Sequence, residues 1–231
     1  KMIDYGKKMF YNSVVSFIAS QGLSIIIAIK LTSSDVGAYN ILLTLTGLTT
    51  FLLLNLNKVF APAISKLHSE KSFIELNILY KKTTFLFNLF AIPLAVIIAI
   101  FSDEILGLYT FEMLVYKKYL FYMLVGGILN LAAGSSGTFM LMAGLEKQNL
   151  KIQLIRALLL IFLSLLFIPI IGLLSVVGLY VISNLFVNGA QVIYIAKYLK
   201  ISPFSKELFF IFGLTILAMY FAINQEFVFQ I

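Results

Sequence analysis

Six stretches of this chain run for 18 or more residues without an Asp, Glu, Lys or Arg, and they constrain its fold more than any other feature. They are residues 9–29, 36–57, 83–102, 119–145, 157–196 and 208–225. A helix needs about 20 apolar residues to cross a bilayer core. The stretch 157–196 is long enough for two spans, and "FIPIIGLLSVVG" (167–178) within it carries the Pro and Gly of a tight hairpin. The pattern predicts seven membrane spans.

The composition supports lipid as the solvent. Hydrophobic residues make up 61% of the chain and charged residues 12%, whereas a soluble domain has about 25% charged residues. Backbone polar groups find no water in the bilayer core, so the spans are expected to be helices, whose backbone hydrogen bonds are internal. We therefore predict an all-α fold, a polytopic transmembrane helical bundle of about seven spans.

The basic residues predict the orientation. If the spans alternate from the N-terminus, one face of the membrane holds 14 of the 17 basic residues and the other holds only Lys30, Lys117 and Lys118. Short cytoplasmic loops are rich in Lys and Arg, so we expect the N-terminus in the cytoplasm and a multi-pass protein in a cytoplasmic membrane. Because the basic residues lie between apolar runs, the net charge of +7 indicates topology and not nucleic acid as a partner.

Four predicted spans carry small or polar residues at helical spacing, which allows two interpretations. Such residues pack membrane helices closely and hydrogen-bond across interfaces, or they line an aqueous cavity. We favour packing for the glycine-rich fourth span, whose "GSSG" (134–137) is expected inside the helix, and leave both interpretations open for the sixth. The four sets are Ser13, Ser16, Ser20 and Ser24 beside Gln21; Asn40, Thr44 and Gly47; Gly126, Asn130, Gly134 and Gly137; and Tyr180, Asn184, Asn188 and Gln191.

Charged and titratable residues give no catalytic pattern. The chain has no Cys, and His68 is its one His, so neither a metal cluster nor a His-based triad can be assembled. We expect no enzymatic activity and no cofactor. Arg156 is expected about five residues into a helix that begins near Ile152. There it either snorkels at the cytoplasmic end, the interpretation we favour, or contacts an anion at a cavity mouth.

The segment "NKVFAPAISKLHSEKS" (57–72) looks like the exit of the second span. Pro62 is expected to limit the helix there, since proline removes one backbone hydrogen bond. On either side of it, Phe60, Ile64 and Leu67 form an apolar edge at spacings of 4 and 3. This edge predicts a short helix in the lipid headgroup zone.

The order of these features resembles the C-terminal half of polysaccharide flippases (Wzx-type), in the multidrug/oligosaccharidyl-lipid/polysaccharide exporter superfamily. The resemblance covers roughly residues 10–200, and the order of its short motifs is more specific than any one of them. It departs at Ala63, where the family often has Arg, and at "LLSVVG" (173–178), where many members have "GA". The matching residues are Val36, Gly37 and Tyr39; Ala61, Pro62 and Leu67; Pro93; Ala143, Gly144 and Lys147; and Ile168, Pro169, Gly172 and Gly178.

The resemblance implies two six-helix lobes with the substrate path between them. Residues 1–200 would then form the second lobe and residues 201–231 an additional C-terminal transmembrane helix. The first lobe would lie upstream in the same chain. The implied substrate is a lipid-linked oligosaccharide, moved across a bacterial cytoplasmic membrane from the inner to the outer leaflet by alternating access. Gln21, Asn184, Asn188 and Arg156 would line its cavity.

Two other functions remain open. An ion-coupled multidrug or metabolite exporter of the same superfamily usually has a carboxylate inside the membrane, but all ten acidic residues here lie at span ends or in loops. A membrane-embedded glycan polymerase or transferase would need a sizeable outer loop with charged residues, whereas the predicted outer loops are short.

Overall fold

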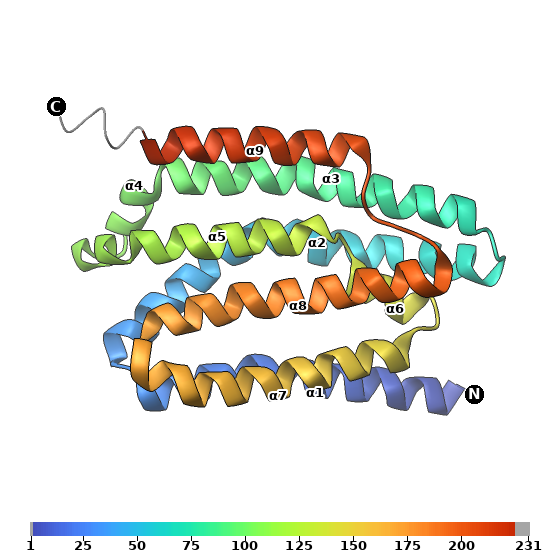
Figure 1. Ribbon diagram of the computed structural model, residues 1–231, viewed down its shortest axis with the longest axis horizontal. Helices are drawn as coiled ribbons and strands as arrows, with labels where there is room; N and C mark the ends of the chain where they lie inside the picture. The colour runs from blue at the N-terminus through green and yellow to red at the C-terminus, as the bar shows by residue number, and fades with distance from the viewer. Residues whose placement is uncertain (1, 225–231) are drawn as a thin grey trace.

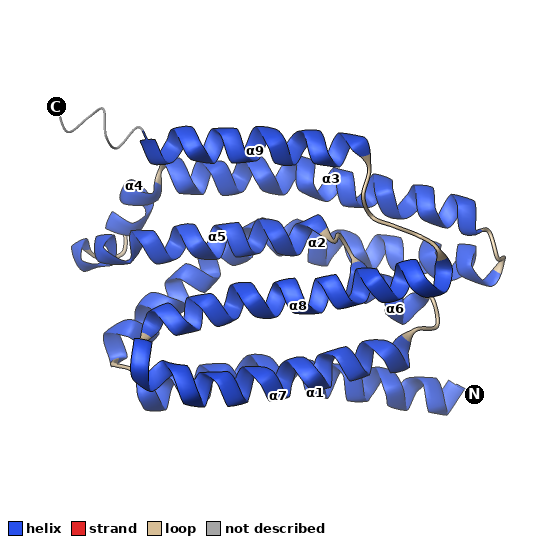
Figure 2. Cartoon of the chain, in the orientation of Figure 1, coloured by secondary structure: helices blue, strands red, loops and turns tan. Residues whose placement is uncertain are grey.

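The computed structural model describes the backbone of residues 2–224, and their side chains except those of 2–5, 8–9, 16, 18–24, 52 and 216–224. This part of the chain is helical and contains no strand, which confirms the all-α prediction (Figure 2). The helices are α1 (Met2–Lys30), α2 (Ser33–Ser69), α3 (Phe73–Ile100), α4 (Ser102–Gly107), η1 (Phe111–Tyr116), α5 (Lys117–Ala132), α6 (Ser136–Met142), α7 (Glu146–Ile171), α8 (Leu173–Leu199) and α9 (Lys206–Asn224).

Helices cover each of the seven predicted spans, the fourth with two helices, α5 and α6. Among the described residues, five segments are long and apolar enough to cross a membrane: 33–69, 73–100, 111–142, 146–171 and 173–199. This chain is therefore a multi-pass membrane protein. Spanning by α1 and α9 stays a prediction, as does the division into a lobe at 1–200 and an added helix at 201–231.

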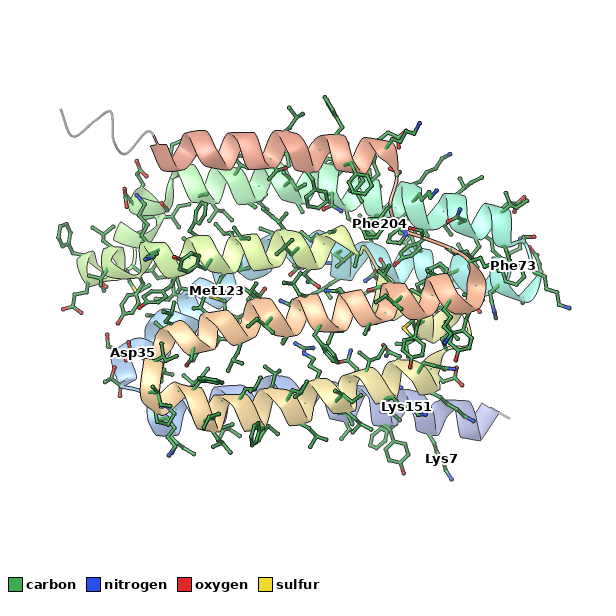
Figure 3. All side chains as sticks on the ribbon, in the orientation of Figure 1. Lys7, Asp35, Phe73, Met123, Lys151 and Phe204 are labelled. Carbon is green, nitrogen blue, oxygen red and sulfur yellow. The ribbon has the colours of Figure 1, made fainter. Side chains whose placement is uncertain are left out.

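The long helices lie side by side along the long axis of the molecule (Figure 1). Helix α1 packs against α7, α7 against α8, and α8 against α5; α5 also contacts α2 and α3, and α9 covers α3. Lys7 and Lys151 lie toward one end of the bundle and Asp35 at the other (Figure 3). This is the separation that alternating spans require, while the side that faces the cytoplasm stays a prediction.

The interior has two main apolar clusters. The first gathers residues such as Leu42, Ile98 and Met123 near the α4 end. The second contains Leu76, Phe139 and Ile195 near the opposite end. Along α5 and α6, the stretch between the two clusters carries Asn130, Ser135 and Ser136, so polar side chains occupy a layer inside the bundle.

The predicted hairpin at 167–178 is confirmed. Helix α7 ends at Ile171 and α8 begins at Leu173, with Gly172 between them at φ +65°. That backbone conformation is open to glycine and strained for other residues. The Ser175 hydroxyl donates to the Gly172 carbonyl at 2.6 Å, which satisfies a backbone group at the turn.

The expectation that Pro62 limits the second helix is wrong, because α2 continues as one helix to Ser69. The cause is packing. Ile64 is buried in the second cluster, and Phe60 and Leu67 pack against it. The apolar edge that suggested a helix in the headgroup zone instead covers other helices, and this contact offsets the one hydrogen bond that Pro62 removes.

The fourth predicted span is interrupted, which corrects the placement of "GSSG" inside a helix. Helix α5 ends at Ala132 and α6 begins at Ser136, with Gly134 at φ +59° between them. A discontinuous helix inside a membrane protein is tolerated where protein groups satisfy the freed backbone. The neighbours of this break form the candidate site.

Candidate functional site

Two side chains of α3 satisfy the backbone at the break between α5 and α6. The Tyr80 hydroxyl donates to the Ala133 carbonyl at 2.8 Å, and Asn88 Nδ2 donates to the Leu131 carbonyl at 2.8 Å. Both side chains are almost fully buried. A helix end without such partners would leave unpaired carbonyls in an apolar interior. The break is therefore built into the structure by α3.

A chain of amide and hydroxyl contacts starts at the first turn of α6 and runs outward to α1. The Ser136 hydroxyl donates to Gln191 Oε1 at 2.7 Å, and Gln191 Nε2 donates to Asn149 Oδ1 at 2.8 Å. Asn149 Nδ2 then donates to Asn12 Oδ1 at 2.9 Å. These four residues come from α6, α8, α7 and α1 and are all buried. The contacts join four helices by one continuous hydrogen-bonded path.

A second branch runs toward α5 and α2. Asn188 Nδ2 donates to Asn130 Oδ1 at 2.6 Å and to the Asn184 carbonyl at 2.9 Å. Asn188 Oδ1 also lies 3.1 Å from the Ser136 hydroxyl. On the other side of the break, the Ser135 hydroxyl donates to Asn57 Oδ1 of α2. The break thus lies where five helices meet through polar side chains.

The two interpretations of the sixth predicted span apply to different parts of it. Gln191 is 2% exposed and bonds to two other helices, so it holds the bundle together. Asn188 is half-buried and bonds to α5. Asn184 is half-buried and interacts with Tyr180 of its own helix. Packing therefore describes the part of the stripe from Asn188 to Gln191. In the part at Tyr180 and Asn184, no side-chain amide hydrogen-bonds to another helix among the described residues.

We expect replacement of Gln191 by leucine to destabilise the bundle, because Ser136 and Asn149 would lose their buried partner. Leaving such groups unpaired costs about 1–3 kcal/mol. The thermal midpoint of the purified protein, followed by circular dichroism, should fall. Replacement of the exposed Lys197 on the same helix by Gln is the matched control. An unchanged midpoint in the Gln191→Leu variant would contradict the role assigned to this path.

Arg156 lies further from the start of its helix than the sequence suggested. Helix α7 begins at Glu146 and not near Ile152, so at 1.5 Å per residue Arg156 is about 15 Å from the start of the helix. Snorkelling at the cytoplasmic end and contact with an anion both stay predictions for this residue. The side chain is half-buried, and its Nε is buried without a hydrogen-bond partner among the described residues.

The surroundings of Arg156 are polar on one side and apolar on the other. The Arg156 side chain lies within electrostatic range of Tyr39 on α2 and Tyr180 on α8. It also borders a small cavity of about 90 Å³ between α7 and α8, whose other lining residues are leucines and similar side chains apart from Ser183. A guanidinium whose Nε has no hydrogen-bond partner among the described residues suits an anionic ligand, because its planar N–H groups match the oxygens of a phosphate.

The first two helices also carry polar residues that the sequence analysis singled out. The side chain of Gln21 in α1 lies outside the described residues. On α2, Asn40, Thr44, Asn55 and Lys58 are all exposed on one face of the helix, with the exposed apolar Leu48 and Phe51 between Thr44 and Asn55. Thr44 and Asn55 donate to carbonyls of α2 itself and to no other helix.

The sequence predicted only part of this face of α2. The spacing of Asn40 and Thr44 was visible, whereas Asn55 and Lys58 return to the same face only 11 and 14 residues after Thr44, beyond Leu48 and Phe51. Polar side chains exposed in a spanning helix are costly in lipid, so such faces meet an aqueous cavity or another protein surface. Among the described residues, no group of three His, Cys, Asp or Glu is placed to hold a metal ion.

Comparison with known proteins gives one result. No curated protein and no solved structure matches the chain. Residues 1–111 match a family model described as "Polysaccharide biosynthesis protein". These residues comprise α1, α2, α3 and α4, and therefore the exposed polar face of α2. Over this part, the chain is similar to a polysaccharide biosynthesis family, which agrees with the resemblance seen in the sequence.

Proposed function

We propose that this membrane protein is one lobe of a flippase that moves a lipid-linked oligosaccharide from the cytoplasmic to the outer leaflet by alternating access. The observation that carries the proposal is the exposed polar face of α2, which lies in the part of the chain that matches the polysaccharide biosynthesis family. Carrying sugars and a pyrophosphate through hydrocarbon without polar partners would cost many kcal/mol. A polar face along a span lowers that cost.

The residues suggest how the substrate is held. Asn40, Thr44 and Asn55 offer amide and hydroxyl groups to sugar hydroxyls, and Asn184 adds an amide from α8. Arg156 supplies a cation for the phosphate end, as its buried, unpaired Nε suggests. Asn188, which we predicted to line the cavity, is bonded to Asn130 and in this proposal positions α8 beside α5. Gln21 stays a predicted cavity residue.

The same face suggests the missing partner. We propose that a second lobe of the same polypeptide lies opposite α2, with the substrate path between the two lobes. Transporters built from structural repeats commonly place their site at the repeat interface. In this arrangement the N-terminus of the described chain is in the cytoplasm of a bacterial cell and the 31–32 turn is at the outer surface.

Single cysteines test the position of the path, because the chain has no native Cys. We expect Asn40→Cys, Thr44→Cys and Asn184→Cys to react with a polar, sulfonate-bearing maleimide, since their side chains would face water. Leu158→Cys, at an exposed apolar position of α7, is the lipid-facing control and should stay unlabelled. Gln191→Cys should be protected by packing. Labelling at Leu158→Cys but not on α2 would contradict the proposed path.

Transport itself is tested with the intact protein in liposomes that contain a fluorescent lipid-linked oligosaccharide. We expect the protein to speed the appearance of the fluorophore in the outer leaflet, measured by an impermeant quencher. Ion-driven uptake of a drug, with no effect on the lipid-linked sugar, would favour the exporter instead. Extension of the glycan would favour a polymerase.

A further inference from the structure

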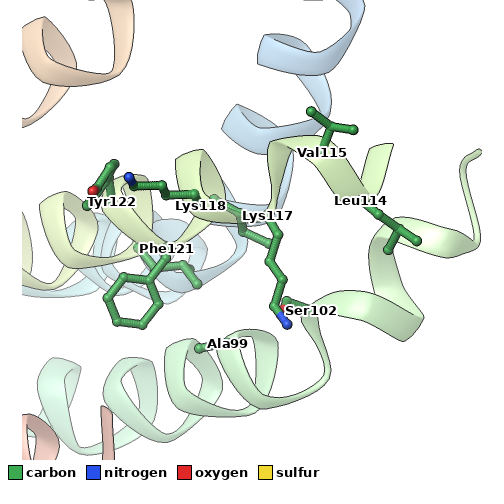
Figure 4. Close-up of a pocket in the computed structure, with 10 residues that line it drawn as sticks. Ala99, Ser102, Leu114, Val115, Lys117, Lys118, Phe121 and Tyr122 are labelled. Atoms are coloured by element: carbon green, nitrogen blue, oxygen red, sulfur yellow. The ribbon is translucent and has the colours of Figure 1, made fainter. Parts of the chain in front are cut away.

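A cavity outside the candidate site lies at the α4 end of the bundle. It has a volume of about 500 Å³ and lies between the end of α3, α4, η1 and the start of α5 (Figure 4). Its walls are mostly apolar, with Ala99, Leu114 and Phe121 among them, and it opens to the outside. Neither the family match nor the proposed transport path gives this cavity a role.

The polar groups of the cavity are gathered at one side. Lys117 extends from α5 toward Ser102, and Lys118 extends toward Tyr122 (Figure 4). Lys118 Nζ lies 5.8 Å from the centre of the Tyr122 ring. Ser102 is 3% exposed, and its Oγ is buried without a hydrogen-bond partner among the described residues. A buried hydroxyl with no partner costs free energy unless a ligand or water completes it.

An ion pair positions one of the two ammonium groups. Lys117 Nζ lies 2.7 Å from Asp103 Oδ2, and the Lys117 side chain is 30% exposed. An ammonium has three donors, and Asp103 accepts from one of them. Asp103 thus holds Lys117 at the cavity and at the same time neutralises part of its charge.

The position of the lysines at a membrane surface indicates which class of ligand the cavity would bind. Lys117 and Lys118 immediately precede the charge-free stretch 119–145, so their ammonium groups lie at the depth of lipid headgroups. The apolar walls continue from there toward the bilayer. Two ammonium groups and a hydroxyl at the mouth, above an apolar floor, match an anionic amphiphile: the headgroup phosphate would accept from the lysines and Ser102, and an acyl chain would fill the floor.

We propose that this cavity is a binding site for an anionic phospholipid, formed by Lys117, Lys118 and Ser102 above the apolar walls. It is separate from the substrate path and does not depend on the proposed transport function. The bound lipid fastens α4 and η1 to the membrane surface at the start of α5.

A local fluorescent reporter makes the proposal testable, because the chain contains no Trp. Phe121→Trp places one indole in the cavity wall. In liposomes, we expect phosphatidylglycerol with brominated acyl chains to quench this indole more strongly than brominated phosphatidylethanolamine. The preference should fall by roughly tenfold in Lys117→Gln/Lys118→Gln, since each lysine near a membrane surface attracts anionic lipid. Lys117→Arg/Lys118→Arg should retain the preference for phosphatidylglycerol, which would show that its loss in the Gln/Gln variant is due to charge.

Two further variants separate lipid binding from a structural role. Lys30→Gln removes the third basic residue predicted for the same membrane face, away from the cavity, and should leave the preference unchanged. Asp103→Asn frees Lys117 from its carboxylate and should strengthen the preference, whereas loss of a merely structural ion pair would not.

Three results would overturn the proposal. Equal quenching by the two lipids would show an apolar cavity without headgroup selectivity. An unchanged preference in the Gln/Gln variant would show that the lysines take no part. Loss of the preference on addition of soluble glycerol phosphate would assign the site to a free phosphate and not to a lipid.

Discussion

Replacement of Gly134 by alanine is expected to be the most damaging single change in the described part of this protein. Gly134 has φ +59°, and a Cβ built there would lie 2.1 Å from Thr84 Oγ1 and 3.0 Å from Thr84 Cβ on α3. The left-handed conformation costs a residue with a Cβ roughly 1–2 kcal/mol. The contact with Thr84 adds to this free-energy cost, because α3 would have to move away from the break. The backbone carbonyls at the break accept hydrogen bonds from Tyr80 and Asn88 of α3.

Circular dichroism of the purified protein provides the measurement. We expect Gly134→Ala to lower the free energy of unfolding by about 3–5 kcal/mol, the range of severe core substitutions, or to prevent isolation of a folded protein. Gly178→Ala is the matched control, since no atom outside its own turn lies within 4 Å of the built Cβ.

A double variant separates the two causes. Adding Thr84→Ala to Gly134→Ala removes the Oγ1 and Cγ2 contacts but leaves the positive φ, so stability should recover in part. A Gly134→Ala protein whose thermal midpoint stays within about 2 °C of the natural one would show that the break can move, and would contradict this account.

Replacement of Arg156 by glutamine is expected to have the largest effect on transport. If the guanidinium contacts the phosphate end of the substrate, losing a charge-assisted hydrogen bond of about 1.5–3 kcal/mol should slow flipping by roughly 10- to 100-fold. Arg156→Lys keeps the charge and loses the bidentate geometry of the guanidinium, so its transfer rate should lie between those of the natural protein and Arg156→Gln. The rate of lipid-linked oligosaccharide transfer in liposomes is the measurement.

Stability distinguishes this role from a structural one. No salt bridge to Arg156 is found among the described residues, and its Nε lacks a partner. Removing an unpaired, half-buried charge should therefore leave the thermal midpoint unchanged or raise it. Lys151→Gln, an exposed residue of the same helix, is the control for charge alone. A Gln variant that transports normally, or one that unfolds, would contradict the assignment.

The helices themselves were predictable because each charged residue in lipid costs free energy regardless of its distant neighbours, so the charge-free stretches mark the spans. Each charge-free stretch is helical, although 119–145 is interrupted, and the hairpin at Gly172 followed from local backbone preferences. The prediction was wrong where a contact far along the chain overruled a local preference. Pro62 did not end α2, because Ile64 is buried against the second cluster.

The candidate site was less predictable for the same reason. Asn184 and Gln191 lie on one stripe, yet only the neighbours from α6 and α7 show that Gln191 joins helices. The position of Arg156 within α7 depended on where that helix begins, and the structure places this start at Glu146, after α6 ends at Met142. The pattern of α2 extended to Asn55 and Lys58 only once their exposure was known.

The amino-acid sequence by itself determined that this is a helical membrane protein, roughly where its helices run, and its family resemblance, because apolar length, charge placement and turn residues act locally. The tertiary structure alone decided where a helix breaks, which amides bond to one another and which polar face remains uncovered. These depend on side chains brought together from distant helices, as when Tyr80 and Asn88 of α3 accommodate the interruption at Gly134.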